Sequence, residues 1–173
     1  MNPYTYCPVC TAALEPKVLG GKTRQVCPEG HFTHWDNPIP VVAAIVEWGE
    51  GVVLVRSIGW PEHFFGLVTG FLEKGESAEE AVIREVKEET GLDGKIASFV
   101  GLYTFFQRNQ LLMVYHIRAS GERITLDETE LNGWKHVPVD ELRPWPMGTG
   151  PALQDWLRTQ GYEREFLDMR KFK

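Results

Sequence analysis

The sequence predicts an α+β domain that follows a small N-terminal metal-binding segment. Three observations support this prediction. Several apolar runs have the length of buried strands, one polar segment has the start and stop signals of a helix, and three cysteines near the N-terminus are spaced like metal ligands. A chain of 173 residues accommodates one ordinary domain and an appendage. We place the appendage at residues 1–35 and the domain at residues 36–173.

The composition is that of a folded protein without a membrane span. Hydrophobic residues make up 43% of the chain, which is normal for a packed core. The formal net charge of −6 argues against broad binding of nucleic acid or membrane surfaces. No signal-peptide pattern or bilayer-length apolar run occurs, so we expect a cytoplasmic location. In that compartment cysteines act as thiols or metal ligands rather than disulfides. An organellar form with its transit peptide removed is the alternative.

The appendage contains two loops with candidate metal ligands. Cys7 and Cys10 enclose two residues, and Cys27 follows after sixteen more. Two thiolate loops at this interval can close a tetrahedral Zn²⁺ site, which folds a segment too small to hold a core. A zinc site with four protein ligands would be structural, because no position is left for catalysis.

The fourth candidate ligand of the appendage is not a cysteine. A four-cysteine ribbon would have cysteine at the position of Gly30. We expect His31 to be the ligand instead, with His34 as the alternative. A degenerate ribbon without metal, a disulfide and another metal are the remaining interpretations.

Three apolar segments after the appendage are predicted strands. Residues 36–40 form a linker with turn chemistry, and residues 41–47 form a continuous apolar run typical of a central strand. Glycines at 49–51 indicate a turn, so residues 52–57 would return as the second strand of a hairpin. Residues 65–70 would form a strand that leads into a glycine-containing loop.

Residues 77–91 carry the signals of one helix. Ser77 followed by Glu80 is a capping box, and Gly91 stands where a helix ends. The interior contains neither glycine nor proline. This combination predicts a helix independently of its packing.

Three glutamates occupy one face of this helix. Glu85, Glu88 and Glu89 lie at positions i, i+3 and i+4, on the side of Ala81 and Val82, which would turn inward. Like charges this close repel one another, and burial strengthens the repulsion. A solvated acidic surface is the ordinary interpretation of such a helix. If the carboxylates are partly buried, they require a hard divalent cation such as Mg²⁺ or Mn²⁺.

The segment from residue 70 to residue 92 resembles the Nudix box, Gly-x5-Glu-x7-Arg-Glu-U-x-Glu-Glu-x-Gly-U, where U is a bulky aliphatic residue. Its defined positions are filled by Gly70, Glu76, Arg84, Glu85, Val86, Glu88, Glu89, Gly91 and Leu92. By this resemblance the chain is identified as a member of the Nudix hydrolase family. The resemblance implies the Nudix fold, a mixed β-sheet sandwiched between α-helices. It also implies divalent-metal-dependent hydrolysis of a nucleoside diphosphate linked to another moiety.

The resemblance further implies roles for the residues of the box. The three helix glutamates would hold the metal, and Gly70 would let the backbone approach metal or phosphate closely. Arg84 would orient a box carboxylate through an ion pair. Glu76 would be a structural partner further from the metal.

The order of ribbon, Asn-Pro junction and hairpin is similar to that of the NADH-pyrophosphatase-like branch of the family. That similarity implies an ADP-linked substrate, of the ADP-ribose, NADH or FAD type, and AMP as a product. The branch carries a Ser-Gln-Pro-Trp-Pro-Phe-Pro signature after the box, whereas residues 103–110 can align only Gln107 with it. NADH preference therefore does not follow. RNA caps, modified nucleoside triphosphates and a catalytically silent nucleotide sensor are the alternatives.

The C-terminal half is predicted to complete the domain. Residues 95–106 and 111–118 would be paired strands, and short helices would begin at 139–142 and 151–157. Residues 127–137 resemble an acidic loop and strand found late in many Nudix domains.

The acidic loop supplies a further candidate for the active site. Glu130, with Glu128 in reserve, would add a metal ligand or the general base, although an exposed acid is an equal interpretation. Within the box, Glu85 or Glu88 would be the base.

Two aromatic residues before the box are candidates for the substrate site. Trp60 and Phe64 would stack on a base, and ordinary core packing is the alternative for each. The expected partner is a small nucleotide rather than a membrane or nucleic acid. A homodimer is also expected, either directly or through the ribbon.

Overall fold

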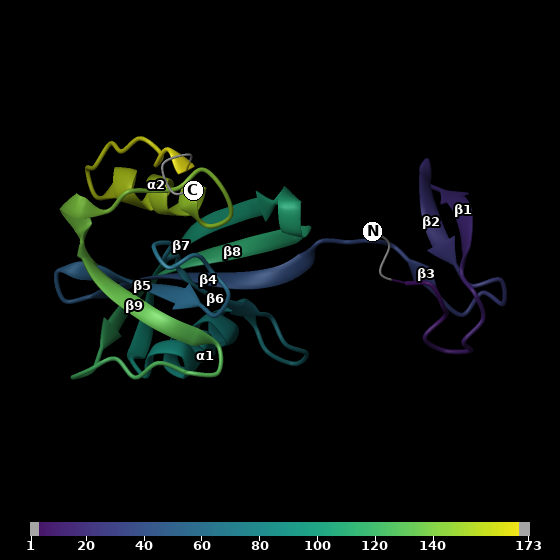
Figure 1. The fold of residues 1–173 in the computed structure, drawn as a ribbon, viewed down its shortest axis with the longest axis horizontal. Helices are drawn as coiled ribbons and strands as arrows, with labels where there is room; N and C mark the ends of the chain where they lie inside the picture. Colours follow the sequence, from purple (N-terminus) through teal and green to yellow (C-terminus); the bar gives the residue numbers. More distant parts are fainter. Residues whose placement is uncertain (1–3, 170–173) are drawn as a thin grey trace. The chain divides into compact units, whose positions relative to one another are not determined.

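The computed structural model describes residues 4–169 and divides between Pro38 and Ile39 into two compact units (Figure 1). The division falls close to the predicted boundary at residues 35 and 36. The N-terminal unit is a three-stranded antiparallel sheet in the order β1-β2-β3. Its strands are β1 (Glu15–Leu19), β2 (Lys22–Val26) and β3 (Thr33–His34).

The second unit is a mixed sheet with a helix on each face (Figure 1). The strand order is β7-β8-β4-β5-β9, and β6 pairs with β4 beside β5. The β4 and β8 strands are parallel, and the other neighbours are antiparallel. The strands are β4 (Ile39–Trp48), β5 (Gly51–Ser57), β6 (Val68–Phe71), β7 (Asp93–Phe105), β8 (Gln110–Ser120) and β9 (Leu131–Pro138). The helices are α1 (Ala78–Thr90) and α2 (Gly150–Thr159). The predicted fold class is confirmed.

The apolar run of β4 is continuous because both of its faces are buried. Alternate residues enter two different cores, since side chains along a strand point to opposite faces. Val41, Ala43 and Ile45 pack on the side of α2. Their neighbours Val42, Ala44 and Val46 pack on the side of α1.

The α1 helix begins and ends where the sequence predicts. The Ser77 hydroxyl accepts the backbone N–H of Glu80 at 3.2 Å, and the Glu80 carboxylate accepts the backbone N–H of Ser77 at 2.8 Å. Gly91 adopts a φ of 72°, a left-handed conformation that favours glycine, and its N–H reaches the Lys87 carbonyl. The capping box and the glycine end are confirmed.

Two predicted elements differ from the structure. Residues 65–67 lie outside β6, because Gly66 makes only an isolated bridge to Val55 while Phe64 and Phe65 turn toward the core. The expected helix at 139–142 is a single 3₁₀ turn, η2 (Val139–Glu141), since Leu142 is already extended. Within residues 4–169, no helix combines the length and the apolar character that a membrane span requires.

Candidate active site

The β6 strand and α1 bring a glycine and a glutamate into contact. Gly70 pairs with Val42, which faces α1, so the α-carbon of Gly70 is turned toward the helix. A Cβ added at Gly70 would lie 1.8 Å from the Cδ of Glu85. The carboxyl group of Glu85 therefore lies directly against the backbone of β6, an arrangement that only glycine permits.

Arg84 holds three carboxylates of the box at once. Its guanidinium pairs with Glu76 at 2.7 Å, with Glu85 at 2.7 Å and with Glu88 at 2.9 Å. It also donates to the carbonyl of Phe71 at 3.2 Å. Hydrogen bonding to Glu76 is the largest of the effects that raise the pKa of Arg84, so this residue stays charged. The side chain thus reaches the acidic face although a helical wheel places Arg84 away from it.

Glu76 closes the loop between β6 and α1. Its carboxylate accepts the backbone N–H of Glu73 at 2.8 Å and pairs with Arg84 through both oxygens. The Arg84 hydrogen bonds hold the pKa of Glu76 below its usual value. Glu76 therefore acts on the shape of the loop that follows Gly70.

Glu89 is a buried carboxylate in a negative environment. Its residue is only 6% exposed, and its Oε2 atom has no hydrogen-bond partner within the described residues. Burial raises the pKa of Glu89 to about 8, and the charges of Glu85, Glu130, Asp127 and Glu88 add to the shift. A cation between these groups would satisfy the free oxygen and lower the pKa again.

The other two helix glutamates differ in exposure. The side chain of Glu85 is 12% exposed, and burial raises its pKa against the opposing effect of Arg84. The side chain of Glu88 is 55% exposed. The buried pair, Glu85 and Glu89, is thus better placed than Glu88 to hold an ion away from bulk water.

The acidic loop after β8 lies beside the helix glutamates. The backbone N–H of Asp127 approaches the carbonyl of Glu89 at 3.4 Å, and the carbonyl of Glu130 accepts the N–H of Ile58 at 2.8 Å. The charge of the predicted Glu130 is among those that raise the pKa of Glu89, so Glu130 joins the acidic group, and the reserve candidate Glu128 lies exposed in the same loop. Asp127 is an addition that the sequence analysis missed. Its local signal is the turn in which its carboxylate accepts two hydrogen bonds from Thr129.

The positions of the three predicted substrate contacts do not by themselves indicate a nucleotide site. The rings of Trp60 and Phe64 pack against each other at a tilt of 55° with centroids 5.1 Å apart, and the Phe64 ring meets that of the buried Trp145 edge-on at 5.8 Å. Core packing is enough to account for this pair. Gln107 lies exposed in the 3₁₀ turn η1 (Phe106–Arg108).

An aromatic ring that the sequence analysis missed lies next to the glycine loop. Phe71 directly follows Gly70 and is 59% exposed. Its carbonyl is held by Arg84. Its place in the box, immediately after the first glycine, is the signal that could have indicated it.

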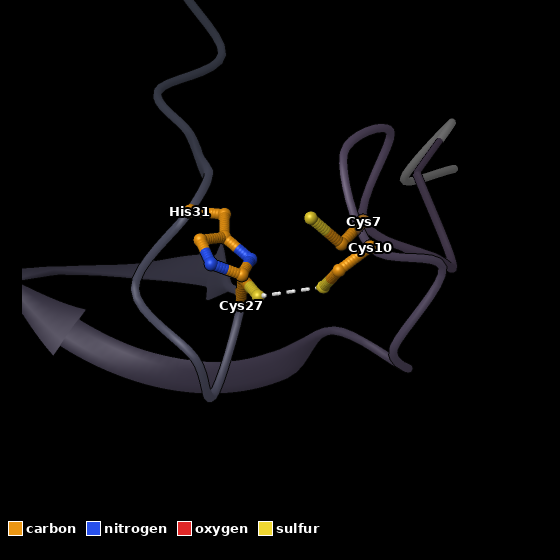
Figure 2. A group of neighbouring side chains, drawn as sticks. All are labelled: Cys7, Cys10, Cys27 and His31. Carbon is orange, nitrogen blue, oxygen red and sulfur yellow. Dashed lines mark hydrogen bonds between the residues drawn. The ribbon is translucent and has the colours of Figure 1, made fainter.

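The N-terminal unit gathers four candidate zinc ligands. One ligand atom from each of Cys7, Cys10, Cys27 and His31 lies within 4.8 Å of the others (Figure 2). The two sulfur atoms of Cys10 and Cys27 are 3.5 Å apart. Three thiolates and an imidazole that converge in this way fit a tetrahedral zinc ion.

The second loop has a conformation that favours glycine at position 30. Gly30 has a φ of 78°, and its N–H bonds to the Cys27 carbonyl. This left-handed turn favours glycine and carries the chain on to His31. The alternative ligand, His34, lies in β3 and packs against Tyr4 with ring centroids 4.7 Å apart.

The catalytic unit is a mixed sheet between two helices, and the carboxylate of Glu85 on α1 lies against Gly70 of β6. This combination defines a class of proteins with an acidic cation-binding site. The chain matches the family profile described as NUDIX domain over residues 37–157. This match spans more than half of the chain, and the protein belongs to the Nudix family.

Curated relatives and solved structures agree with this assignment. A NAD-capped RNA hydrolase NudC of Pseudomonas putida KT2440 is 29% identical over 113 residues, 65% of this chain and 41% of the relative. The NudC of Pseudomonas syringae pv. tomato DC3000 is 28% identical over 145 residues, 83% of this chain and 51% of the relative. The chain thus spans about half the length of the curated relatives it matches.

The solved structures show the same fold. A NUDIX hydrolase from Nitrosomonas europaea has a TM-score of 0.77 at 21% identity, covering 95% of this chain and 97% of that one. An ADP-ribose pyrophosphatase from Streptococcus suis has a TM-score of 0.59 at 20% identity, covering 76% and 97%.

Proposed function

We propose that the protein is a divalent-metal-dependent hydrolase that cleaves the diphosphate of a nucleoside diphosphate linked to another moiety. An ADP-linked substrate, of the ADP-ribose, NADH or FAD type, with release of AMP, fits best. The observation that carries the proposal is Glu89, a buried carboxylate with a free oxygen and four negative neighbours beside the Gly70 loop. The names of the NudC and ADP-ribose pyrophosphatase relatives support this chemistry.

The residues of the box divide the work of the reaction. Glu85 and Glu89 would hold Mg²⁺ or Mn²⁺, with Glu88 at the exposed side. The bound ion would neutralise the diphosphate and lower the pKa of an attacking water. Arg84 fixes the orientation of Glu85 and Glu88. Glu130, Glu85 or Glu88 would accept the water proton, and Glu130 is favoured because Arg84 does not engage it.

Phe71 is the best placed aromatic surface for the nucleotide. An exposed ring stacks on a base, and Phe71 directly follows Gly70 along β6, with its ring on the face of the sheet opposite α1. Trp60 and Phe64 remain candidates from the sequence, but their rings pack against each other with centroids 5.1 Å apart.

An RNA-linked substrate is a second candidate. The curated relatives are named as hydrolases of NAD-capped RNA, so the expectation that nucleic acid is not a ligand stays an open prediction. Nucleotide sensing without turnover and hydrolysis of modified nucleoside triphosphates are further candidate functions.

The N-terminal unit would bind structural zinc through its four converging ligands. This site is consistent with the zinc-ribbon-bearing branch. The cytoplasmic location likewise stays a prediction.

The homodimer would use the outer edge of the sheet. Two register shifts in β7 place Ile96, Phe99 and Leu102 opposite Ile117, Tyr115 and Met113, all of which belong to the core on the α1 side. The three apolar residues of β7 are 37%, 52% and 60% exposed. A second copy would cover them, and gel filtration of Phe99→Arg beside the wild type would test this.

A substrate panel tests the proposed activity. The protein would be incubated with ADP-ribose, NADH, NAD⁺, FAD, ADP-glucose, 8-oxo-dGTP and NAD-capped RNA, with Mg²⁺ or Mn²⁺, beside Glu89→Gln. We expect AMP, or 5′-monophosphorylated RNA, from one or two substrates, and its loss in the variant. Equal turnover by the variant would refute the role of Glu89. Silence across the panel would favour the sensor.

A further inference from the structure

Two cationic side chains meet on the ring of Phe65. The Nζ atom of Lys135 lies 4.2 Å from the ring centroid, and the Cζ atom of Arg56 lies 5.3 Å from it. Phe65 packs against the core on the α2 side of the sheet, and Lys135 pairs with Leu54, which belongs to the same core. The two cations therefore share the face of the sheet opposite α1.

Neither cation of this pair has an ion-pair partner in the part of the chain that the structure describes. No carboxylate oxygen of residues 4–169 lies within 4.0 Å of the charged nitrogens of Arg56 or Lys135. Each cation is attracted to the face of the half-buried Phe65 ring, while the two positive charges repel each other.

Arg56 is already held in place for binding. Its Nε donates to the Asn132 side chain at 2.7 Å, its Nη2 to the Asn132 carbonyl at 3.0 Å and its Nη1 to the Glu62 carbonyl at 2.6 Å. A guanidinium has five N–H donors, so two stay available for a ligand. The conformational entropy of this side chain is lost on folding rather than on binding, which favours recognition.

The cation pair is built on the same strand ends as the acidic loop. Asn132, which anchors Arg56, follows Glu130 by two residues. Ile58, which follows Arg56 by two residues, donates to the Glu130 carbonyl. Each of the two strands thus leads within two residues from the cation pair, on the face opposite α1, to a contact with the acidic loop.

We propose that Arg56 and Lys135, supported on Phe65, bind a phosphate group that the substrate carries in addition to the diphosphate that is cleaved. Arginine offers paired donors to phosphate oxygens and lysine a point charge, the usual combination for this anion. The extra phosphate has two sources, the 2′-phosphate of a dinucleotide or the 3′-phosphodiester of a capped RNA. The inference rests on the proposed function for the identity of the substrate, but its test does not require turnover.

Calorimetric binding of product analogues tests the site in the protein loaded with Mg²⁺. The probes are AMP, adenosine 2′,5′-bisphosphate and adenosine 3′,5′-bisphosphate. We expect one bisphosphate to bind the wild type about tenfold more tightly than AMP, the range of a charge-assisted hydrogen bond. A preference for the 2′-isomer identifies a phosphorylated dinucleotide, and a preference for the 3′-isomer identifies RNA.

Lys135→Gln should abolish this preference, and Lys135→Arg should keep most of it. Lys95→Gln is the matched control, because Lys95 is an exposed strand lysine at the opposite edge of the sheet. Bisphosphates that bind no better than AMP, or not at all, would overturn the proposal. So would an equal effect of Lys95→Gln and Lys135→Gln.

Turnover separates this proposal from the proposed function. The panel is extended by NADPH, which differs from NADH by one phosphate. Hydrolysis without any bisphosphate preference leaves the function standing and removes the phosphate site. A Lys135-dependent preference in a protein that hydrolyses no substrate of the panel would support the phosphate site and remove the proposed function.

Discussion

The carboxyl group of Glu85 occupies the space in which a side chain on Gly70 would lie, with its Cδ 1.8 Å from the position of an added Cβ. The contact joins β6 directly to the middle of α1. Its consequence is that the glycine sets where the Glu85 oxygens point. The next residue along β6, Phe71, pairs with Val41 and so belongs to the opposite face of the sheet.

Gly70→Ala should displace Glu85 and reduce kcat by about 100-fold, since an error of about 1 Å in a catalytic group has this effect. Thermal unfolding should change little, because Gly70 has no positive φ and the Glu85 side chain can swing toward solvent. Steady-state hydrolysis of the best panel substrate measures the loss.

A double-mutant cycle checks that the effect passes through Glu85. In a Glu85→Gln background the added methyl group should cost much less than in the wild type, because residues in contact are not additive. Additive losses would show that the glycine acts on something else.

Arg84 should control metal affinity without touching the metal. In Arg84→Gln the carboxylates of Glu76, Glu85 and Glu88 lose their common partner. We expect Mn²⁺ to bind about 10–100-fold more weakly, as when ligand-orienting partners of metal sites are removed. Titration by electron paramagnetic resonance measures this, and Arg84→Lys should recover part of the affinity. Wild-type affinity in Arg84→Gln would contradict the positioning role.

Phe71→Ala should raise KM more than it lowers kcat. A ring stacked on a base contributes about 1–3 kcal/mol, equivalent to a KM increase of about 5- to 150-fold. Phe106→Ala is the control, because Phe106 is 84% exposed at the tip of the β7–β8 hairpin. If both variants behave alike, the base lies elsewhere.

The local features of the site could be predicted from sequence, and the long-range ones could not. The capping box and Gly91 depend on contacts within a few residues, so the bounds of α1 follow directly. The approach of Asp127 to Glu89 depends on how the sheet returns the chain, which no local pattern encodes.

Arg84 shows a second limit of sequence reasoning. A helical wheel gives the direction of Cα–Cβ bonds, whereas an arginine side chain is long enough to cross to a neighbouring face. The family resemblance indicated the ion pair, but the wheel did not. The three-carboxylate arrangement becomes visible only when the loop that carries Glu76 is in place.

The two histidines of the N-terminal unit give a matched test of the zinc ligands. His31→Ala should lose zinc, because His31 converges with the three cysteines, whereas His34→Ala should retain it. Zinc content per chain by mass spectrometry distinguishes them. Chelation of the wild type should erase the amide NMR signals of β1, β2 and β3, since a site of this kind supplies the folding energy of a small unit. If only His34→Ala loses zinc, His34 and not His31 is the fourth zinc ligand.

A buried histidine should make the catalytic unit sensitive to acid. His116 Nε2 lies 2.7 Å from the Glu47 carboxylate, and the ring packs against Trp156 of α2. Burial is the largest effect on the pKa of His116 and lowers it, with Arg118 in the same direction and Glu47 opposing both.

The sign of the acid sensitivity follows from this lowered pKa. The folded protein favours the neutral imidazole, so the contribution of His116 to stability is complete above the unfolded value of 6.5 and is lost as the pH falls below it. In urea titrations at pH 7 and pH 5, the wild type should therefore lose more free energy of unfolding than His116→Gln. The glutamine keeps a donor for Glu47 but does not titrate, and the other groups titrate in both proteins. Equal losses in the two proteins would mean that protonated His116 is as well accommodated as the neutral form.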